Sequence, residues 1–157
     1  MSDTVLTTAP NFSLPSSGGD VVSRADLAGH PAVLFFYPRD NTPGCTTENI
    51  DFTALYPEFQ ALECAVFGIS KDSMSSHEKF IAKKDIGVPL LSDEHSTACE
   101  DFGVWVEKKM YGKVFMGIQR ATFLIDAQGQ IVREWRKVKV KDHAADVLEA
   151  LRSLSAG

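Results

Sequence analysis

The sequence predicts an α/β fold in which a central mixed sheet is flanked by helices. Three short apolar runs, each bounded by turn residues, are typical of strands buried on both faces: residues 32–37, 65–70 and 88–92. Helical patterns separate these runs, and strands that alternate with helices pair in parallel within one sheet. Two further runs near the C-terminal end predict a hairpin at the edge of this sheet.

The first elements follow from turn residues and from helical spacing. Residues 16–20, SSGGD, are a Gly/Ser cluster that predicts a hairpin turn between NFSL and VVS. After Cys45, apolar residues recur at helical spacing, and Pro57 predicts a kink in this helix. The predicted apolar stripe consists of Ile50, Leu55, Phe59 and Leu62.

The second half of the chain predicts two helices and a hairpin. Ser75 and Glu78 have the spacing of a capping box, which predicts a helix start in SSHEKFIAKK. Residues 121–135 predict two strands around an Ala-Gln-Gly turn. The chain closes on an amphipathic helix. The apolar face of this helix consists of Ala144, Val147, Leu148 and Leu151.

Length, charge and cysteine content narrow the class of protein. The 157 residues are enough for one domain, expected to span residues 1–157. The net charge of −5 argues against non-specific nucleic-acid binding, which needs a basic surface. The N-terminal segment lacks the basic region and apolar core of a signal peptide, and no apolar run approaches the ~18 residues needed to cross a bilayer. Three cysteines, an odd number, predict a reducing cytoplasm rather than a secreted disulfide framework.

Cys45 occupies a position that favours chemistry. It follows the apolar run 32–37, and sites in parallel sheets gather at the carboxyl ends of the strands. The helix start predicted at this point would place the sulfur near unpaired backbone N–H groups and the positive end of the helix dipole. This favours the thiolate, which is the nucleophilic form. Arg39, close in sequence, and Arg120, just before the strand ATFLI, are the cations that could favour it further.

The segment YPRDNTPGCTTE resembles the active-site segment of peroxiredoxins, whose pattern is P-x-x-x-[TS]-x-x-C. The segments SHEKF, EKKMYGKVFMGIQRATFLID and WRKVKVKDHAADVL resemble the PrxQ branch, historically called bacterioferritin comigratory proteins, so the likeness covers nearly the whole chain. It implies a thioredoxin-like fold, a monomer, and reduction of hydrogen peroxide and organic hydroperoxides without a cofactor. The partner implied is a reducing thiol, which is thioredoxin, glutaredoxin or glutathione.

By position, the resemblance implies a role for each residue around the cysteine. Cys45 would be the peroxidatic cysteine, Pro38 and Thr42 its loop partners, and Arg120 the guanidinium that holds thiolate and peroxide. Pro38 can shield the sulfur from water, and Thr42 can donate a hydroxyl hydrogen bond towards it. Glu48 stands one turn after the cysteine, where it either hydrogen-bonds Arg120 or serves as a favourable acid in the first turn of the helix.

The regeneration of Cys45 is where the chain departs from its relatives. The two usual positions of a resolving cysteine in PrxQ-like proteins hold Ile50 and Ile81. Cys64 precedes a parallel strand and is expected at the opposite end of the sheet. Cys99 is expected on the active-site side, in a helix that faces the core. The sequence therefore predicts a one-cysteine cycle completed by an external thiol, with Cys99 as the alternative resolving residue.

Other functions are weighed against the peroxidase. A disulfide reductase needs C-x-x-C, and Thr42 occupies the first position of that pattern here. A redox sensor or holdase on the same fold stays open, because sequence does not separate binding from turnover. A metal site is not predicted, because the histidines have no metal-ligand spacing: His30, His77, His95 and His143.

Overall fold

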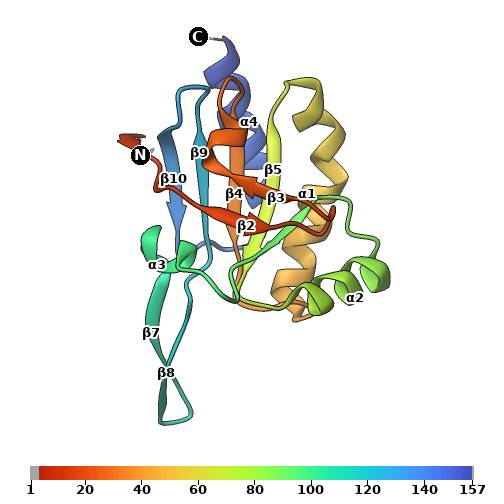
Figure 1. The fold of residues 1–157 in the computed structure, drawn as a ribbon, viewed down its shortest axis with the longest axis vertical. Coiled ribbons are helices and arrows are strands. Elements are labelled where there is room, and N and C mark those ends of the chain that lie inside the picture. The colour runs from red at the N-terminus through yellow and green to blue at the C-terminus, as the bar shows by residue number, and fades with distance from the viewer. Residues whose placement is uncertain (1–3, 157) are drawn as a thin grey trace.

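The computed structural model describes residues 4–156, in which six strands form one mixed sheet (Figure 1). The strands at residues 32–36, 65–70 and 90–92 pair in parallel. The pairs towards the opposite edge of the sheet, which is formed by residues 4–8, are antiparallel. The predicted mixed sheet is therefore confirmed. The order across the sheet is β1 (Thr4–Thr8), β10 (Gln130–Arg136), β9 (Ala121–Ile125), β4 (Ala32–Phe36), β5 (Ala65–Ser70) and β6 (Leu90–Ser92).

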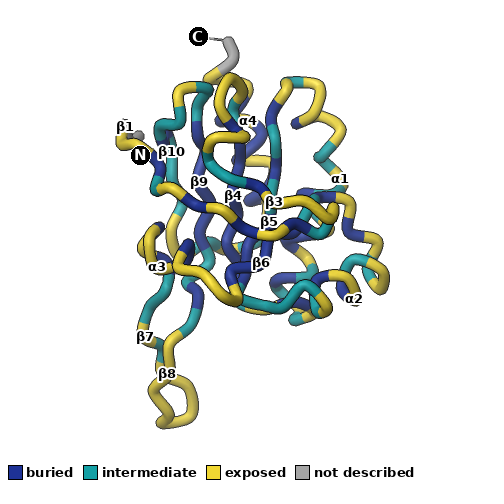
Figure 2. The backbone as a smooth tube through the Cα atoms, in the orientation of Figure 1, coloured by how far each residue is buried: buried dark blue, intermediate teal, exposed yellow. Residues whose placement is uncertain are grey.

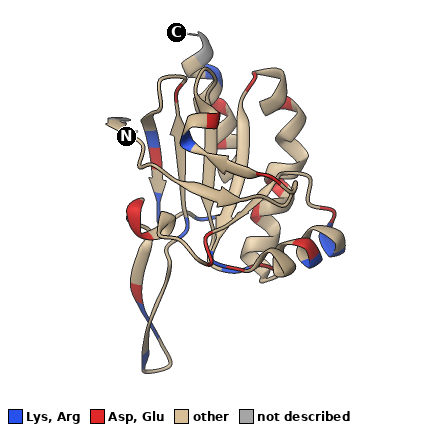
Figure 3. Cartoon of the chain, in the orientation of Figure 1, with Lys and Arg blue, Asp and Glu red and all other residues tan. Residues whose placement is uncertain are grey.

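Strand β4 is the centre of the hydrophobic core. Val33 and Phe35 point to one face of the sheet, while Leu34 and Phe36 point to the other, and all four are fully buried. Because successive side chains of a strand alternate between faces, a strand covered on both sides must be apolar throughout. The central strands accordingly form the dark interior of Figure 2, and they carry few charges in Figure 3.

Different elements cover the two faces of the sheet (Figure 1). Helical residues form the core of one face, and the N-terminal hairpin with α3 packs on the other face. The helices of the first face are α1 (Pro43–Ala61), α2 (Met74–Lys84) and α4 (His143–Ala156). The elements of the second face are β2 (Ser13–Pro15), β3 (Val21–Ser23), η1 (Arg24–Leu27) and α3 (Ala98–Asp101).

Helix α1 corrects one detail of the sequence prediction. The helix includes the exposed Pro57 and continues as far as Ala61, and the predicted kink at this proline stays a prediction. Ile50, predicted to be buried, is 45% exposed, whereas Phe52 is buried. The rest of the predicted stripe is confirmed, because Phe59 is fully buried and Leu55 and Leu62 pack against the same core. Two polar residues of this helix, Glu48 and Asn49, are buried as well.

The other predicted elements are present, with one correction at α2. The helix begins at Met74 and its N-cap is Ser73, whose hydroxyl accepts a hydrogen bond from Ser76 N–H at 3.1 Å. Ser75 therefore lies inside the first turn, and the predicted capping box is wrong. The hairpin β2–β3, the pair β9–β10 and the buried face of α4 are confirmed. The predicted edge position of the β9–β10 hairpin is wrong, because β1 pairs with β10 and forms the edge of the sheet. Among the described residues, no helix is long and apolar enough to cross a membrane.

An unpredicted hairpin projects from the end of the sheet where β4 stops (Figure 1). Its strands are β7 (Trp105–Met110) and β8 (Lys113–Ile118), and Tyr111 at its tip is 97% exposed. Figure 2 shows most of this hairpin as exposed. Both of its faces meet solvent over most of their length, so no apolar periodicity of a half-buried strand marked it in the sequence.

Candidate active site

The N-terminal turn of α1 holds Cys45. Thr42 is the N-cap, with extended backbone angles, and Pro43 is the first helical residue. Proline suits this position because the amide it lacks would have had no partner within the helix. The first intrahelical hydrogen bond runs from Thr46 N–H to Thr42 C=O at 2.8 Å. The backbone N–H of Cys45 therefore belongs to the unpaired first turn, where the helix dipole favours an anion.

Arg120 reaches this turn from the start of β9. Its Nη2 lies 3.3 Å from Cys45 Sγ, and its Nη1 donates to Glu48 Oε1 at 2.6 Å. Of the two alternatives that the sequence leaves open for Glu48, the hydrogen bond to Arg120 is therefore present. A Cβ atom on Gly44 would lie 3.2 Å from Arg120 Nη2, so a side chain at this position would crowd the guanidinium. Cys45 itself is only 1% exposed, and the Arg120 guanidinium is a charged group beside its sulfur.

The electrostatics of this trio follow from its burial. Burial raises the pKa of Glu48 to about 7, although the charge and hydrogen bond of Arg120 oppose this shift. Burial alone would lower the pKa of Arg120, but the charges of Glu48 and Cys45 outweigh it and raise that pKa. The guanidinium therefore stays charged. It is shared between the Cys45 sulfur and the Glu48 carboxyl group, which changes charge near neutral pH.

The loop before α1 places the two other predicted residues. The Thr42 hydroxyl donates to Arg39 C=O at 2.9 Å, so the expected hydrogen bond towards the sulfur is corrected to one that closes the loop on itself. Pro38 is half-buried and lines a cavity of about 310 Å³ together with Lys108 and Phe115 of the β7–β8 hairpin. Burial and the charge of Arg120 lower the pKa of Lys108, one of the residues that line this cavity.

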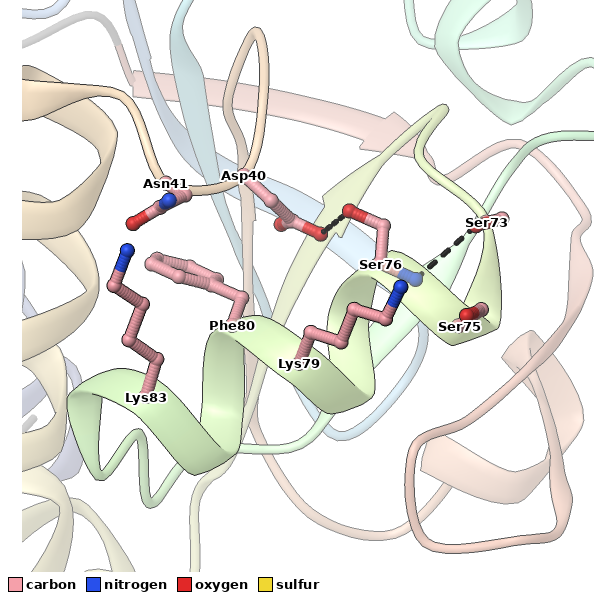
Figure 4. Close-up of a pocket in the computed structure, with 8 residues that line it drawn as sticks. All are labelled: Asp40, Asn41, Ser73, Ser75, Ser76, Lys79, Phe80 and Lys83. Carbon is pink, nitrogen blue, oxygen red and sulfur yellow. Dashed lines mark hydrogen bonds between the residues drawn. The ribbon is translucent and has the colours of Figure 1, made fainter.

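A polar network that the sequence prediction missed lies behind the same loop. Asp40, Asp72 and His77 bring their side-chain ligand atoms within 4.8 Å of one another, a grouping that could hold a metal ion. In the structure, Nδ1 of His77 is hydrogen-bonded to the Asp40 carboxylate. The carboxylates of Asp40 and Asp72 also accept hydrogen bonds from the hydroxyls of Ser76 and Ser70, respectively. Figure 4 shows Asp40 hydrogen-bonded to Ser76 of α2, and both residues line a cavity of about 350 Å³. Sequence spacing held no signal for this network, because its members come from three separate segments.

The other two cysteines lie apart from this arrangement of charges. Cys64 directly precedes β5 and is buried at the end of the parallel strands opposite Cys45, as predicted. Burial raises its pKa to about 12. Cys99 is fully buried in α3, also as predicted, and burial together with the charge of Asp93 raises its pKa. All three cysteines are free thiols in the structure.

Comparisons with known proteins agree with this geometry. The profile of the AhpC/TSA family matches residues 5–134. The chain is 49% identical to peroxiredoxin Bcp of Xanthomonas campestris pv. campestris over 156 residues, covering 98% of each chain. It is 46% identical to peroxiredoxin Bcp of Bacillus subtilis over 147 residues, covering 94% of each.

Solved structures extend the likeness to the fold. Peroxiredoxin Q of Xanthomonas campestris superposes with a TM-score of 0.88 at 46% identity, covering 98% of each chain. A yeast mitochondrial one-cysteine peroxiredoxin, described with a thiol resolving mechanism via glutathione and thioredoxin systems, has a TM-score of 0.80 at 25% identity, covering 96% of this chain and 75% of that one. The thioredoxin-like fold is thereby confirmed. The chain therefore belongs to the AhpC/TSA family and, within it, to the Bcp or PrxQ group of peroxiredoxins.

Proposed function

We propose that this protein is a thiol-dependent peroxidase that reduces hydrogen peroxide and organic hydroperoxides through a sulfenic acid on Cys45. The observation that carries the proposal is the Arg120 guanidinium 3.3 Å from Cys45 Sγ, at the N-terminal turn of α1. A buried thiol beside a cation and unpaired N–H groups is held ready to react as a thiolate.

The chemical step uses this geometry directly. The thiolate attacks one peroxide oxygen, so an S–O bond forms while the O–O bond breaks. The leaving alkoxide or hydroxide takes a proton and departs as alcohol or water. Sulfur is oxidised by two electrons, and the peroxide is reduced by two. The charge that develops on the leaving oxygen is stabilised by two donors that are already in place, the Arg120 guanidinium and the Cys45 N–H. Glu48 orients the guanidinium. The loop residues Thr42 and Pro38 surround these donors.

We infer that an external thiol completes the cycle. The first thiol attacks the sulfenic sulfur and releases water, and a second thiol releases Cys45 as a disulfide forms between the two reductants. Burial of both Cys64 and Cys99, with raised pKa values, supports this one-cysteine cycle. Thioredoxin, glutaredoxin or glutathione is the proposed reductant. Resolution by Cys99 is the alternative, and it requires α3 to unwind, because a disulfide needs Cα atoms within about 7 Å.

Two measurements test the function and the cycle. Peroxide consumption with dithiothreitol should be abolished in Cys45→Ser and retained in Cys64→Ser and Cys99→Ser. A wild-type protein that consumes no peroxide would point to the sensor or holdase function instead. Mass spectrometry after one equivalent of peroxide should show sulfenic acid and no intramolecular disulfide. A Cys45–Cys99 cross-link, lost in Cys99→Ser together with thioredoxin-dependent turnover, would refute the one-cysteine cycle.

We further infer a monomer in a reducing cytoplasm. The three free, buried thiols support a reducing compartment. Size-exclusion chromatography coupled to light scattering tests the oligomeric state, and a mass near twice 17.2 kDa would refute the monomer.

A further inference from the structure

One buried side chain, that of Asp40, holds the loop between β4 and α1. Asp40 is 7% exposed, and its carboxylate accepts three hydrogen bonds. The donors are the Tyr37 hydroxyl at 2.6 Å, the Ser76 hydroxyl at 2.8 Å and Nδ1 of His77 at 2.7 Å. The backbone N–H of Asp40 donates to Asp72 Oδ2 at 2.8 Å. Side chain and backbone of this residue are therefore both fixed, from two neighbouring segments.

Both ring nitrogens of His77 have a hydrogen-bond partner, which fixes the orientation of the ring. His77 is fully buried, and its Nε2 lies 3.0 Å from the carbonyl oxygen of Leu91, which can only accept. Burial would raise the pKa of Asp40, but the hydrogen bond and charge of His77 outweigh it and lower that pKa, so the carboxylate is ionised and also accepts. The contact is a buried, charge-assisted hydrogen bond, which is strong and directional.

The rest of the loop has few other fixed points. Asn41 adopts a left-handed conformation with φ of 60°, and the Thr42 hydroxyl turns back to Arg39 C=O. These contacts shape the loop internally but do not attach it to the body of the protein. Cys45, in contrast, is placed by α1 and Arg120. The anchor of the loop and the placement of the sulfur are thus separate.

We propose that His77 is a positioning residue of the peroxide site. Through Asp40 it holds Pro38 and Thr42 where the peroxide must bind, while the reactivity of Cys45 is set independently by Arg120. This inference rests on the proposed peroxidase function. It distinguishes two properties of one cysteine, which are its reaction with any electrophile and its reaction with a correctly oriented peroxide.

Two isosteric substitutions separate the two hydrogen bonds of His77. The amide nitrogen of Asn stands near the position of Nδ1, so His77→Asn keeps the donor to Asp40. The amide nitrogen of Gln stands near Nε2, so His77→Gln keeps only the contact to the Leu91 carbonyl. Ser75→Ala is the matched control, because Ser75 lines the same cavity without a hydrogen bond to Asp40 (Figure 4). Each variant is assayed for Cys45 oxidation by hydrogen peroxide and for Cys45 alkylation by iodoacetamide.

The proposal gives a distinct result for each variant. His77→Gln should lose between about 10-fold and 100-fold in the peroxide rate, since a misplacement of ~1 Å can cost about 100-fold. Its alkylation rate should stay within about 2-fold of wild type. His77→Asn and Ser75→Ala should stay within about 3-fold in both rates. Equal loss in the two histidine variants, or a parallel loss of alkylation in His77→Gln, would overturn the proposal.

A third measurement separates this inference from the proposed function. Amide hydrogen exchange of peptides covering residues 38–45 reports the loop directly, whether or not the protein reduces peroxide. Exchange in this segment should accelerate in His77→Gln and remain near wild type in His77→Asn. Unchanged exchange in His77→Gln would refute the anchoring role. If the two variants show this exchange pattern but the wild-type protein does not react with peroxide, the peroxidase function is refuted and the anchoring role of His77 is supported.

Discussion

Replacing Arg120 by alanine should harm the protein in two separable ways. The change removes Nη2, 3.3 Å from Cys45 Sγ, and with it a donor to the developing charge of the transition state. It also removes the ion-pair partner of Glu48, whose side chain is 1% exposed and whose Oε1 lies 2.6 Å from Nη1. The first loss reduces the rate of peroxide reduction, and the second reduces the free energy of unfolding.

The sizes of the two losses follow from the geometry. Removing one preorganised donor costs about 10²–10³ in rate, which corresponds to about 2.7–4 kcal/mol of transition-state stabilisation. Removing one partner of a buried ion pair costs about 3–5 kcal/mol of stability. Because the pKa of Glu48 is about 7 even with Arg120 present, protonation relieves part of this second cost at lower pH. Arg120→Ala should therefore be more destabilised at pH 8 than at pH 6.

A double variant separates the two effects. In Arg120→Ala/Glu48→Gln no uncompensated charge is buried, so most of the unfolding free energy should return while the rate stays low. Stopped-flow oxidation of Cys45 gives the rate, and urea unfolding gives the stability. Arg152→Ala is the control, because it breaks a half-exposed pair with Glu58 at 2.8 Å. This control should cost between about 0 and 1 kcal/mol of stability and leave the rate unchanged.

Two results would refute this reasoning about Arg120. A folded Arg120→Ala variant whose peroxide rate lies within about 3-fold of wild type would remove the guanidinium from the chemical step. A double variant that regains the wild-type rate would show that Arg120 acts through the integrity of the fold alone.

Three further predictions concern packing and pH. Gly68→Ala should lower the unfolding free energy by about 1–3 kcal/mol in urea titrations, because its Cβ would lie 2.7 Å from the Phe35 ring and 2.8 Å from a Leu90 methyl group; an unchanged midpoint would contradict this packing. Glu48 has a folded pKa raised from 4.5 to about 7, so the folded state holds more protons and the stability from that proton is lost as pH rises through this window. Glu48→Gln should therefore gain up to about 3 kcal/mol relative to wild type between pH 5 and pH 8, and a constant difference would speak against the shift. Burial lowers the pKa of His143 from 6.5 to about 4, so wild type should lose up to about 3 kcal/mol as pH falls through this window, a loss that His143→Gln should not show in unfolding curves at pH 7 and pH 4.

Local patterns in the sequence determined much of the fold and the identity of the nucleophile. The run around β4 is apolar at every position because both of its faces are covered, and that requirement is visible without coordinates. The Thr-Pro-Gly start of α1 is equally local, because N-cap and first-turn preferences depend on neighbouring residues. Cys45 could therefore be placed at a helix start beyond a strand end. The β7–β8 hairpin was not predicted because neither of its faces is predominantly buried. Its sequence therefore lacks the alternation of apolar and polar residues that marks a half-buried strand.

Only the tertiary structure decided which groups meet around Cys45. Arg120 stands 75 residues further along the chain, and it arrives because β9 pairs with β4 so that Ala121 lies opposite Phe36. The same packing directs Glu48 inward, where its pKa rises, and it brings His77 against Asp40 across 37 residues. Periodicity reports which face of an element is buried, but it has no information on which buried faces touch. Distances, ion pairs and shifted pKa values depend on those contacts, so they follow from sheet register and helix packing rather than from any local pattern.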